Sequence, residues 1–127
     1  MPDQVTTVAA LAALAAGPSR LRGVAVTRGH ETDRLAALHA ELAKLGVAVT
    51  ERPDGLEVAG AGPQALRPAR LATWGDHRMA MALAAVAARV PGVVLEDPAC
   101  VAKTYPGFWH DLAAAGLRWR PRPGPLQ

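Results

Sequence analysis

The sequence has one cysteine, few aromatic side chains and no long hydrophobic run, and each absence excludes a class of protein. Cys100 cannot form a disulfide within the chain, and no spacing of Cys and His resembles a zinc site. Aromatic residues make up only 4% of the chain, so a core must be built from Ala, Val and Leu. The longest apolar run, residues 79–88, is too short for a membrane span of about 20 residues, and no signal peptide precedes it. We therefore expect a cytoplasmic protein with no metal site.

Lysine is scarce as well, and the positive charge is almost all arginine. Among fourteen basic residues only Lys44 and Lys103 are lysines, and eleven acidic residues leave a formal net charge of +3. A surplus this small does not by itself predict nucleic-acid binding, so we expect neither a nucleic-acid nor a membrane partner. The alternative, a basic nucleic-acid binder, would depend on the arginine-rich residues 118–127, which we predict to be a flexible tail.

Hydrophobic residues make up 50% of the 127 positions and charged residues 20%, which favours one modest folded domain and excludes global disorder. At its start, Asp3 is a suitable N-cap for a helix through residue 16, with Val8, Leu11 and Leu14 on one face. Gly17-Pro18 is typical of a helix end. The first element is therefore predicted to be a helix over residues 3–16.

A strand over residues 19–27 and a polar loop over residues 28–31 lead to a second predicted helix, which begins at Glu31 or Thr32. Leucines recur on one face of that helix at helical spacing, at Leu35, Leu38, Leu42 and Leu45. Gly46 closes it. Beyond it, the turn residues Pro53-Asp54-Gly55 predict a β-hairpin over residues 47–59.

The same order of elements then starts again. Asp76 caps a predicted helix that runs to about residue 90, a short strand covers residues 93–95, and a helix covers residues 106–115. Asp3 and Asp76 lie 73 residues apart, as do His30 and Lys103 (76 − 3 and 103 − 30). This coincidence predicts a duplicated α/β unit, with repeats over about 1–60 and 61–117 and a tail over 118–127.

In both predicted units, polar side chains cluster where a strand or loop leads into the N-terminus of a helix. Exposed N–H groups and the helix dipole attract anions at such places. Arginine and lysine bind carboxylates or phosphates there, and neighbouring carboxylates suit proton transfer. The residues are Arg28, His30, Glu31 and Arg34 in the first unit, and Asp76, His77, Arg78 and Lys103 in the second. Together they predict an anion site with acid–base capability.

A simpler interpretation of several of these residues stands beside that one. Asp3 and Asp76 act as helix caps in it, a role that needs no catalysis. Glu31 compensates the helix dipole in the first turn, and Arg34 faces solvent. Lys103 is harder to explain in this way, because it is one of two lysines in an arginine-dominated chain.

Three segments resemble signature segments of the enolpyruvylshikimate phosphate synthases, the 3-phosphoshikimate 1-carboxyvinyltransferases. They are Arg-Gly-His-Glu-Thr-Asp-Arg-Leu at 28–35, Gly-Asp-His-Arg-Met-Ala-Met at 75–81 and Ala-Lys-Thr-Tyr-Pro-Gly-Phe at 102–108. Pro2-Asp3 with Thr6-Thr7 is similar to the catalytic aspartate segment of that family. The resemblance runs from about residue 2 to residue 117.

The resemblance implies transfer of the enolpyruvyl group of phosphoenolpyruvate to the 5-hydroxyl of shikimate 3-phosphate, with release of phosphate and without metal or organic cofactor. This is a step of chorismate and aromatic amino acid biosynthesis, and the family is the target of glyphosate. By motif position, Asp3 and Glu31 are the catalytic carboxylates. Asp3 and His30 contact shikimate 3-phosphate, and His30 stands where the family often has lysine. The implied phosphoenolpyruvate ligands are Arg34, Arg78 and Lys103.

The implied fold is an inverse α/β prism built of βαβαββ repeats, of which this chain resembles only part of one domain. We expect residues 1–117 to be a partial C-terminal domain that lacks the N-terminal domain of the enzyme. Catalysis in a cleft needs both walls, so we expect the isolated chain to be an inactive fragment. The alternative is a non-catalytic anion-binding module that keeps the fold.

Overall fold

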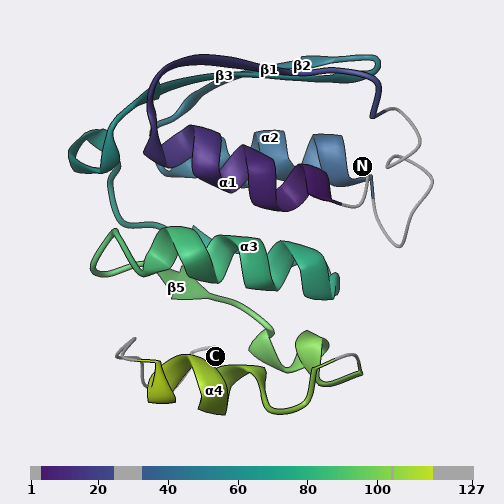
Figure 1. Cartoon of the computed structure of the whole chain (residues 1–127), viewed down its shortest axis with the longest axis vertical. Coiled ribbons are helices and arrows are strands. Elements are labelled where there is room, and N and C mark those ends of the chain that lie inside the picture. Colours follow the sequence, from purple (N-terminus) through teal and green to yellow (C-terminus); the bar gives the residue numbers. More distant parts are fainter. Residues whose placement is uncertain (1–3, 25–32, 104, 116–127) are drawn as a thin grey trace.

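The computed structural model describes residues 4–24, 33–103 and 105–115, without the side chains of Ala102 and Lys103. Within them the chain forms an α/β structure, as the sequence predicts. A three-stranded sheet lies at one end, α1 and α2 cover one of its faces, and α3 packs beneath α1 (Figure 1). The strand β5 (Val94–Leu95), the 3-10 helix η4 (Pro98–Lys103) and α4 (Phe108–Ala114) lie at the opposite end.

The predicted hairpin supplies two of the three strands of the sheet, and its second strand lies at the centre. The strands β2 (Ala48–Arg52) and β3 (Gly55–Ala61) pair antiparallel across the turn, from Ala48 opposite Ala59 to Arg52 opposite Gly55. On its other edge β3 pairs antiparallel with β1 (Ala16–Leu21), which gives the strand order β1-β3-β2. Pro53 and Asp54 occupy the turn between the two hairpin strands, as the sequence predicts.

The first helix, α1, covers Val5–Leu14 and is shorter than predicted. Its N-cap is Gln4, without a side-chain capping bond, so the predicted cap at Asp3 is wrong; Asp3 itself lies outside the described residues. The helix ends at an extended Ala15, and Gly17-Pro18 lies inside β1 rather than at a helix end. Pairing along the whole of β1 with β3 outweighs the helix propensity of the two alanines at 15 and 16.

The leucine face of α1 is not its buried face. Val8 and Leu11 are 40% and 60% exposed, whereas Ala9 and Ala13 are fully buried. The reason is the close approach of α1 to β3: a Cβ placed on Gly60 would lie 2.5 Å from the carbonyl oxygen of Ala12 in α1. Only a helix face of small side chains can pack against a strand at this distance, so Val8 and Leu11 face outward, while Leu14 is half-buried against the core.

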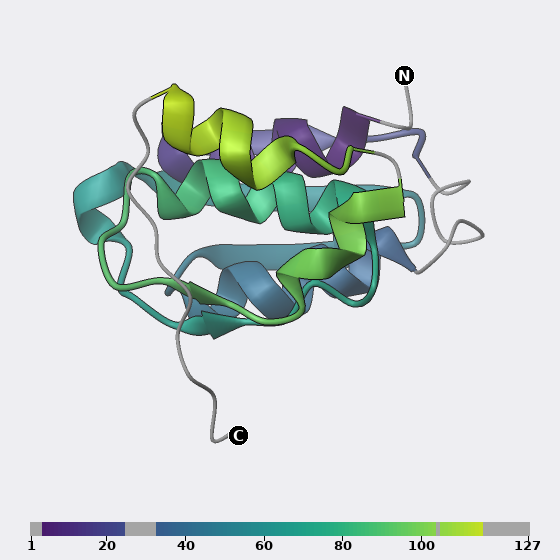
Figure 2. The ribbon, with the colours of Figure 1, turned by 90° about the horizontal axis from the view of Figure 1, so that it is seen from below.

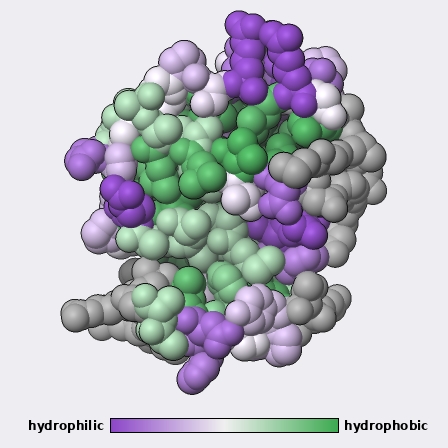
Figure 3. Space-filling model, in the orientation of Figure 1, coloured by the Kyte–Doolittle hydropathy of each residue, from purple (hydrophilic) through white to green (hydrophobic). Residues whose placement is uncertain are grey.

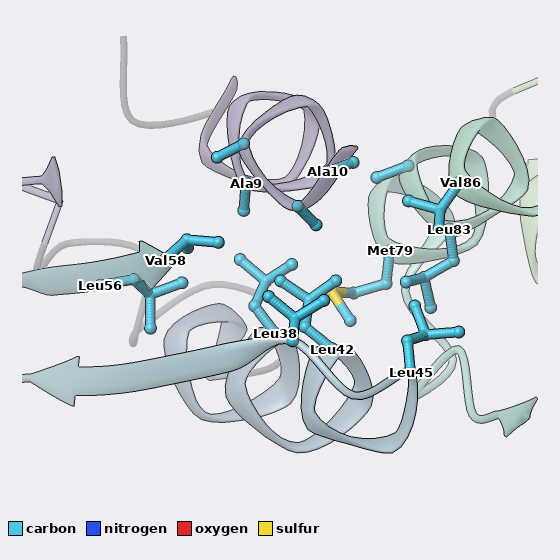
Figure 4. Close-up of a cluster of buried hydrophobic side chains, with 14 of the residues drawn as sticks. Ala9, Ala10, Leu38, Leu42, Leu45, Leu56, Val58, Met79, Leu83 and Val86 are labelled. Atoms are coloured by element: carbon cyan, nitrogen blue, oxygen red, sulfur yellow. The ribbon is translucent and has the colours of Figure 1, made fainter. Parts of the chain in front are cut away.

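The core is built around α2 (Arg34–Lys44), whose predicted leucine stripe is confirmed. Leu35, Leu38, Leu42 and Leu45 are each 0% exposed. They pack against residues from β3, α1 and α3 (His77–Ala87), among them Leu56, Val58, Ala9, Met79, Leu83 and Val86 (Figure 4). One hydrophobic core therefore joins the first half of the chain to the second.

Two short strands and a 3-10 helix connect the remaining elements. The 3-10 helix η3 covers Pro63–Ala65, and β4 (Arg70–Leu71) pairs parallel with β5 through the crossover helix α3. Seen from below, α3 lies between α1 and the β4–β5 pair (Figure 2). The segment 98–103 forms η4, which packs on α3. No helix among the described residues is long and apolar enough to cross a bilayer.

Candidate functional site

The candidate site is built where the N-terminal ends of α2 and α3 meet. Asp33 caps α2, and its side chain accepts a hydrogen bond from the N–H of Ala36 at 3.1 Å. Arg34 is therefore the first residue of α2, and its side chain reaches across to the N-cap of α3, Asp76. The two helices start at the same place although these residues are 42 positions apart in the chain.

Arg34 and Asp76 form a buried two-point ion pair. Arg34 Nε donates to Asp76 Oδ2 at 2.8 Å and Arg34 Nη2 donates to Asp76 Oδ1 at 3.3 Å. Arg34 is 3% exposed and Asp76 is 0% exposed. The interpretation of Arg34 as a solvent-facing arginine is therefore wrong. Because a planar guanidinium bound at two points to a carboxylate has little freedom, its positive charge is fixed beside the start of α3.

The carboxylate of Asp76 binds groups from both helices. Besides binding Arg34, its Oδ1 accepts a hydrogen bond from the backbone N–H of Arg78 at 2.9 Å, so the predicted cap of α3 is confirmed. Burial alone raises the pKa of Asp76, but the hydrogen bonds from the Arg34 side chain and from the backbone of Arg78, with the charge of Arg34, outweigh it. The pKa of Asp76 therefore lies below its ordinary value.

This pKa predicts how the stability depends on pH. A carboxyl whose pKa is lower in the folded than in the unfolded state contributes stability that is complete above the unfolded pKa, here 3.8, and is lost as the pH falls through the folded pKa. We expect Asp76→Asn to be less stable than the wild type near neutral pH, and the two to converge in acid. Urea unfolding from about pH 7 to about pH 2 measures this. A difference that stays constant over that range would contradict the assignment.

The predicted site residues fall into three groups. Arg34, Asp76 and the half-buried Arg78 are brought together at the two helix starts. The backbone of Lys103 ends η4, which packs against α3, but its side chain is not described. Asp3, His30 and Glu31 lie outside the described residues. The expectation that Arg34, Arg78 and Lys103 share one pocket therefore stays a prediction.

Two features of the site were missed in the sequence. The first is the pairing of Arg34 with Asp76, which no local spacing reveals across 42 positions. The second is Glu41, 2% exposed on the buried side of α2. Its signal was a carboxylate placed between Leu38 and Leu42 of the leucine stripe, where a charge needs partners.

The arrangement can hold an anion. The Asp76 carboxylate matches the charge of the Arg34 guanidinium, so the groups that attract an anion here are the half-buried Arg78 side chain and the positive end of the dipole of the 11-residue helix α3. Within the described part of the chain, no group of three or more His, Cys, Asp or Glu could hold a metal ion.

Comparison with known proteins points to one family. The family model described as EPSP synthase (3-phosphoshikimate 1-carboxyvinyltransferase) matches residues 1–112. Curated proteins named 3-phosphoshikimate 1-carboxyvinyltransferase are similar: that of Kocuria rhizophila is 56% identical over 112 residues, which cover 86% of this chain and 24% of that protein. That of Methanopyrus kandleri is 50% identical over 117 residues, covering 91% and 27%. The chain thus spans about a quarter of the length of these relatives.

A solved structure gives the same result for the fold. The EPSP synthase of Acinetobacter baumannii superimposes with a TM-score of 0.85 at 28% identity, covering 91% of this chain and 27% of that one. The predicted enolpyruvyl transferase-like α/β fold, present in part, is confirmed.

Proposed function

Since the chain belongs to the EPSP synthase (3-phosphoshikimate 1-carboxyvinyltransferase) family, we propose that it supplies part of the active site of such an enzyme. The proposed reaction transfers the enolpyruvyl group of phosphoenolpyruvate to the 5-hydroxyl of shikimate 3-phosphate and releases phosphate. Both substrates are soluble phosphorylated metabolites, so the proposed location is the cytoplasm. The proposed division of the chain is into repeat units over about 1–60 and 61–117.

In this proposal the cationic residues bind phosphoenolpyruvate and the carboxylates move protons. Arg34, Arg78 and Lys103 bind the phosphate and carboxylate of phosphoenolpyruvate, because guanidinium and ammonium groups match these oxyanions. Asp3 and His30 contact shikimate 3-phosphate. Asp3 accepts the proton of the 5-hydroxyl while the hydroxyl oxygen adds to phosphoenolpyruvate. Glu31 gives a proton to the methylene carbon and takes one back as phosphate leaves.

One observation carries the proposal: the carboxylate of Asp76 joins the Arg34 side chain to the start of α3, where Arg78 follows. Two of the three implied phosphoenolpyruvate ligands therefore come from segments 44 positions apart (78 − 34) and belong to the same small region. A structural ion pair alone would explain the contact of Arg34. It would not explain why that contact lies at a helix start that carries a second arginine in a family-matching segment.

The remainder of the enzyme is a proposed partner of this chain. The exposed Val8 and Leu11 lie on α1, beside a shallow apolar hollow between α1 and α3 that includes Leu14 and Met81. Figure 3 shows a broad hydrophobic region on this face of the molecule. Large apolar areas on a protein surface mark interaction sites, and the relatives are about four times longer than the matched segment. We therefore propose that other parts of the longer enzyme cover this face.

A chimera tests the function. The segment of this chain that aligns with the Kocuria rhizophila relative at 56% identity replaces the corresponding segment of that protein. We expect the chimera to release phosphate from the two substrates at a rate within about tenfold of the parent. A tenfold difference in rate corresponds to about 1.4 kcal/mol in the activation free energy. Arg78→Ala in the chimera is expected to raise the KM for phosphoenolpyruvate by about tenfold to a hundredfold, the loss of one charge-assisted hydrogen bond.

The matched control is Arg89→Ala, an exposed arginine just beyond the other end of the same helix, which should leave both KM values unchanged. A folded chimera without turnover contradicts the proposal. If that chimera still binds phosphoenolpyruvate, the chain is a non-catalytic anion-binding module instead.

A further inference from the structure

Glu41 is a buried carboxylate that the proposed reaction does not use. It is 2% exposed and accepts three hydrogen bonds. Its Oε1 accepts from the backbone N–H of Ala72 and from Lys44 Nζ, each at 2.8 Å, and its Oε2 accepts from the indole Nε1–H of Trp74 at 2.9 Å. A buried charge is costly unless donors surround it, and two of these three donors belong to the turn between β4 and α3.

That turn has an unusual backbone. Trp74 has φ +60° and Gly75 has φ +64°, so two successive residues are in the left-handed region. Glycine adopts this region freely, but a bulky side chain there is strained and persists only where its surroundings fix it. The surroundings act from two sides. Glu41 holds Trp74 and Ala72 from α2, and the buried Thr73 donates from Oγ1 to the Glu96 carbonyl at 2.9 Å.

The turn ends at Asp76, so side chains of α2 bind it at both ends. Glu41 binds its beginning at Ala72 and Trp74, and Arg34 binds its end at Asp76. Glu41 and Arg34 are seven residues apart, or two helical turns, which places them on the same face of α2. Since α2 is a rigid element packed in the core, the two contacts fix where Asp76 lies relative to the Arg34 guanidinium.

We infer that Glu41 is a positioning residue, which holds the strained turn 72–75 so that Asp76 meets Arg34 and α3 starts beside that arginine. The inference rests on the proposed function in one respect: the site being positioned is the one proposed to bind phosphoenolpyruvate. Glu41 itself touches neither substrate in this proposal. It acts through the turn and Asp76.

Side-chain NMR of the 127-residue chain tests the structural part of the inference, that Glu41 fixes the contact between Asp76 and Arg34. Glu41→Gln keeps the shape but has one acceptor oxygen in place of two, so one of the turn donors loses its partner. We expect the Trp74 indole N–H and the Arg34 Nε–H resonances both to move. The matched control is Lys44→Ala, which removes the half-exposed third donor and leaves the turn contacts, so the Arg34 resonance should stay in place. A folded Glu41→Gln protein with an unchanged Arg34 resonance would overturn the inference.

Kinetics of the chimera test the functional part of the inference, that the positioned site binds phosphoenolpyruvate. For Glu41→Gln we expect the KM for phosphoenolpyruvate to rise about tenfold, with the KM for shikimate 3-phosphate unchanged. A merely structural role would lower the amount of folded enzyme, and with it the apparent kcat, without moving either KM. If the Arg34 resonance moves and the KM for phosphoenolpyruvate does not, Glu41 positions Arg34 as inferred, and the proposed role of Arg34 as a phosphoenolpyruvate ligand is wrong.

A second variant serves if Glu41→Gln does not fold. Trp74→Phe removes the indole N–H together with one ring of the indole, and leaves the bond between Glu41 and the Ala72 backbone. We expect a smaller shift of the Arg34 resonance in the same direction. An Arg34 resonance at its wild-type position in folded Trp74→Phe would overturn the coupling between the turn and the ion pair.

Discussion

Replacing Asp76 with alanine should lower the free energy of unfolding by about 3–5 kcal/mol, which is the cost of leaving one member of a buried ion pair without its partner. Arg34 is 3% exposed and cannot reach water without moving α2 or α3. The variant also loses the cap of α3, since Asp76 accepts the hydrogen bond of the Arg78 N–H. Caps contribute about 1 kcal/mol, so most of the expected loss belongs to the ion pair.

The matched control for this prediction is Asp33→Ala at the start of α2. Asp33 caps its helix as Asp76 does, by accepting the N–H of Ala36, but it is half-buried whereas Asp76 is fully buried. Its loss should cost about 1 kcal/mol. Urea unfolding followed by circular dichroism gives both values, and an osmolyte such as trimethylamine N-oxide brings the transition into range if Asp76→Ala is unfolded in buffer. Equal losses in the two variants would mean that the ion pair contributes nothing beyond a cap.

A double replacement separates the charge from the packing. Arg34→Met with Asp76→Leu exchanges the pair for apolar side chains, and such exchanges are neutral or stabilising in other proteins because the desolvation penalty disappears. We expect the double variant to regain most of the stability that Asp76→Ala loses. A double variant as unstable as the single one would show that the geometry of the pair, and not its desolvation, dominates.

Local patterns in the sequence were sufficient to predict α2, the hairpin and α3, although α2 begins at Arg34 and not at Glu31 or Thr32. The leucines of α2 recur at helical spacing and are all buried, and Pro53-Asp54-Gly55 marks the hairpin turn because its residues favour turn geometry. Asp76 was predicted as a cap and is one. Each of these features depends on residues that are neighbours in the chain, so its physical cause is visible in the sequence itself.

The features that were not predicted depend on contacts between distant segments. The end of α1 is decided by strand pairing with β3, about 45 residues further on, and the exposure of Leu11 by the approach of α1 to Gly60. The candidate site was predicted in its residue types. However, the way Arg34 and Asp76 share one ion pair, and the way Glu41 holds Trp74, follow from packing that no local period encodes.

Two leucines among the described residues, Leu38 and Leu11, are expected to differ strongly in their contribution to stability. Leu38 is fully buried on α2 among the other core leucines, and truncation to alanine should cost about 2–5 kcal/mol through lost burial and a cavity. Leu11 is 60% exposed on α1, and the same truncation should change the stability of the 127-residue chain by at most about 0.5 kcal/mol. Urea unfolding of the two variants measures the contrast.

The Leu11 variant also tests whether the apolar face of α1 is covered in a longer enzyme. In the isolated chain Leu11 borders the hollow between α1 and α3 and loses little when it is shortened. If the rest of the enzyme packs on this face, as proposed, Leu11→Ala in the chimera removes a buried side chain and should cost about 2 kcal/mol or more. The same small change in both proteins would mean that the face stays exposed to water. A cost that appears only in the chimera would identify α1 as a place where the rest of the chimera packs on this segment.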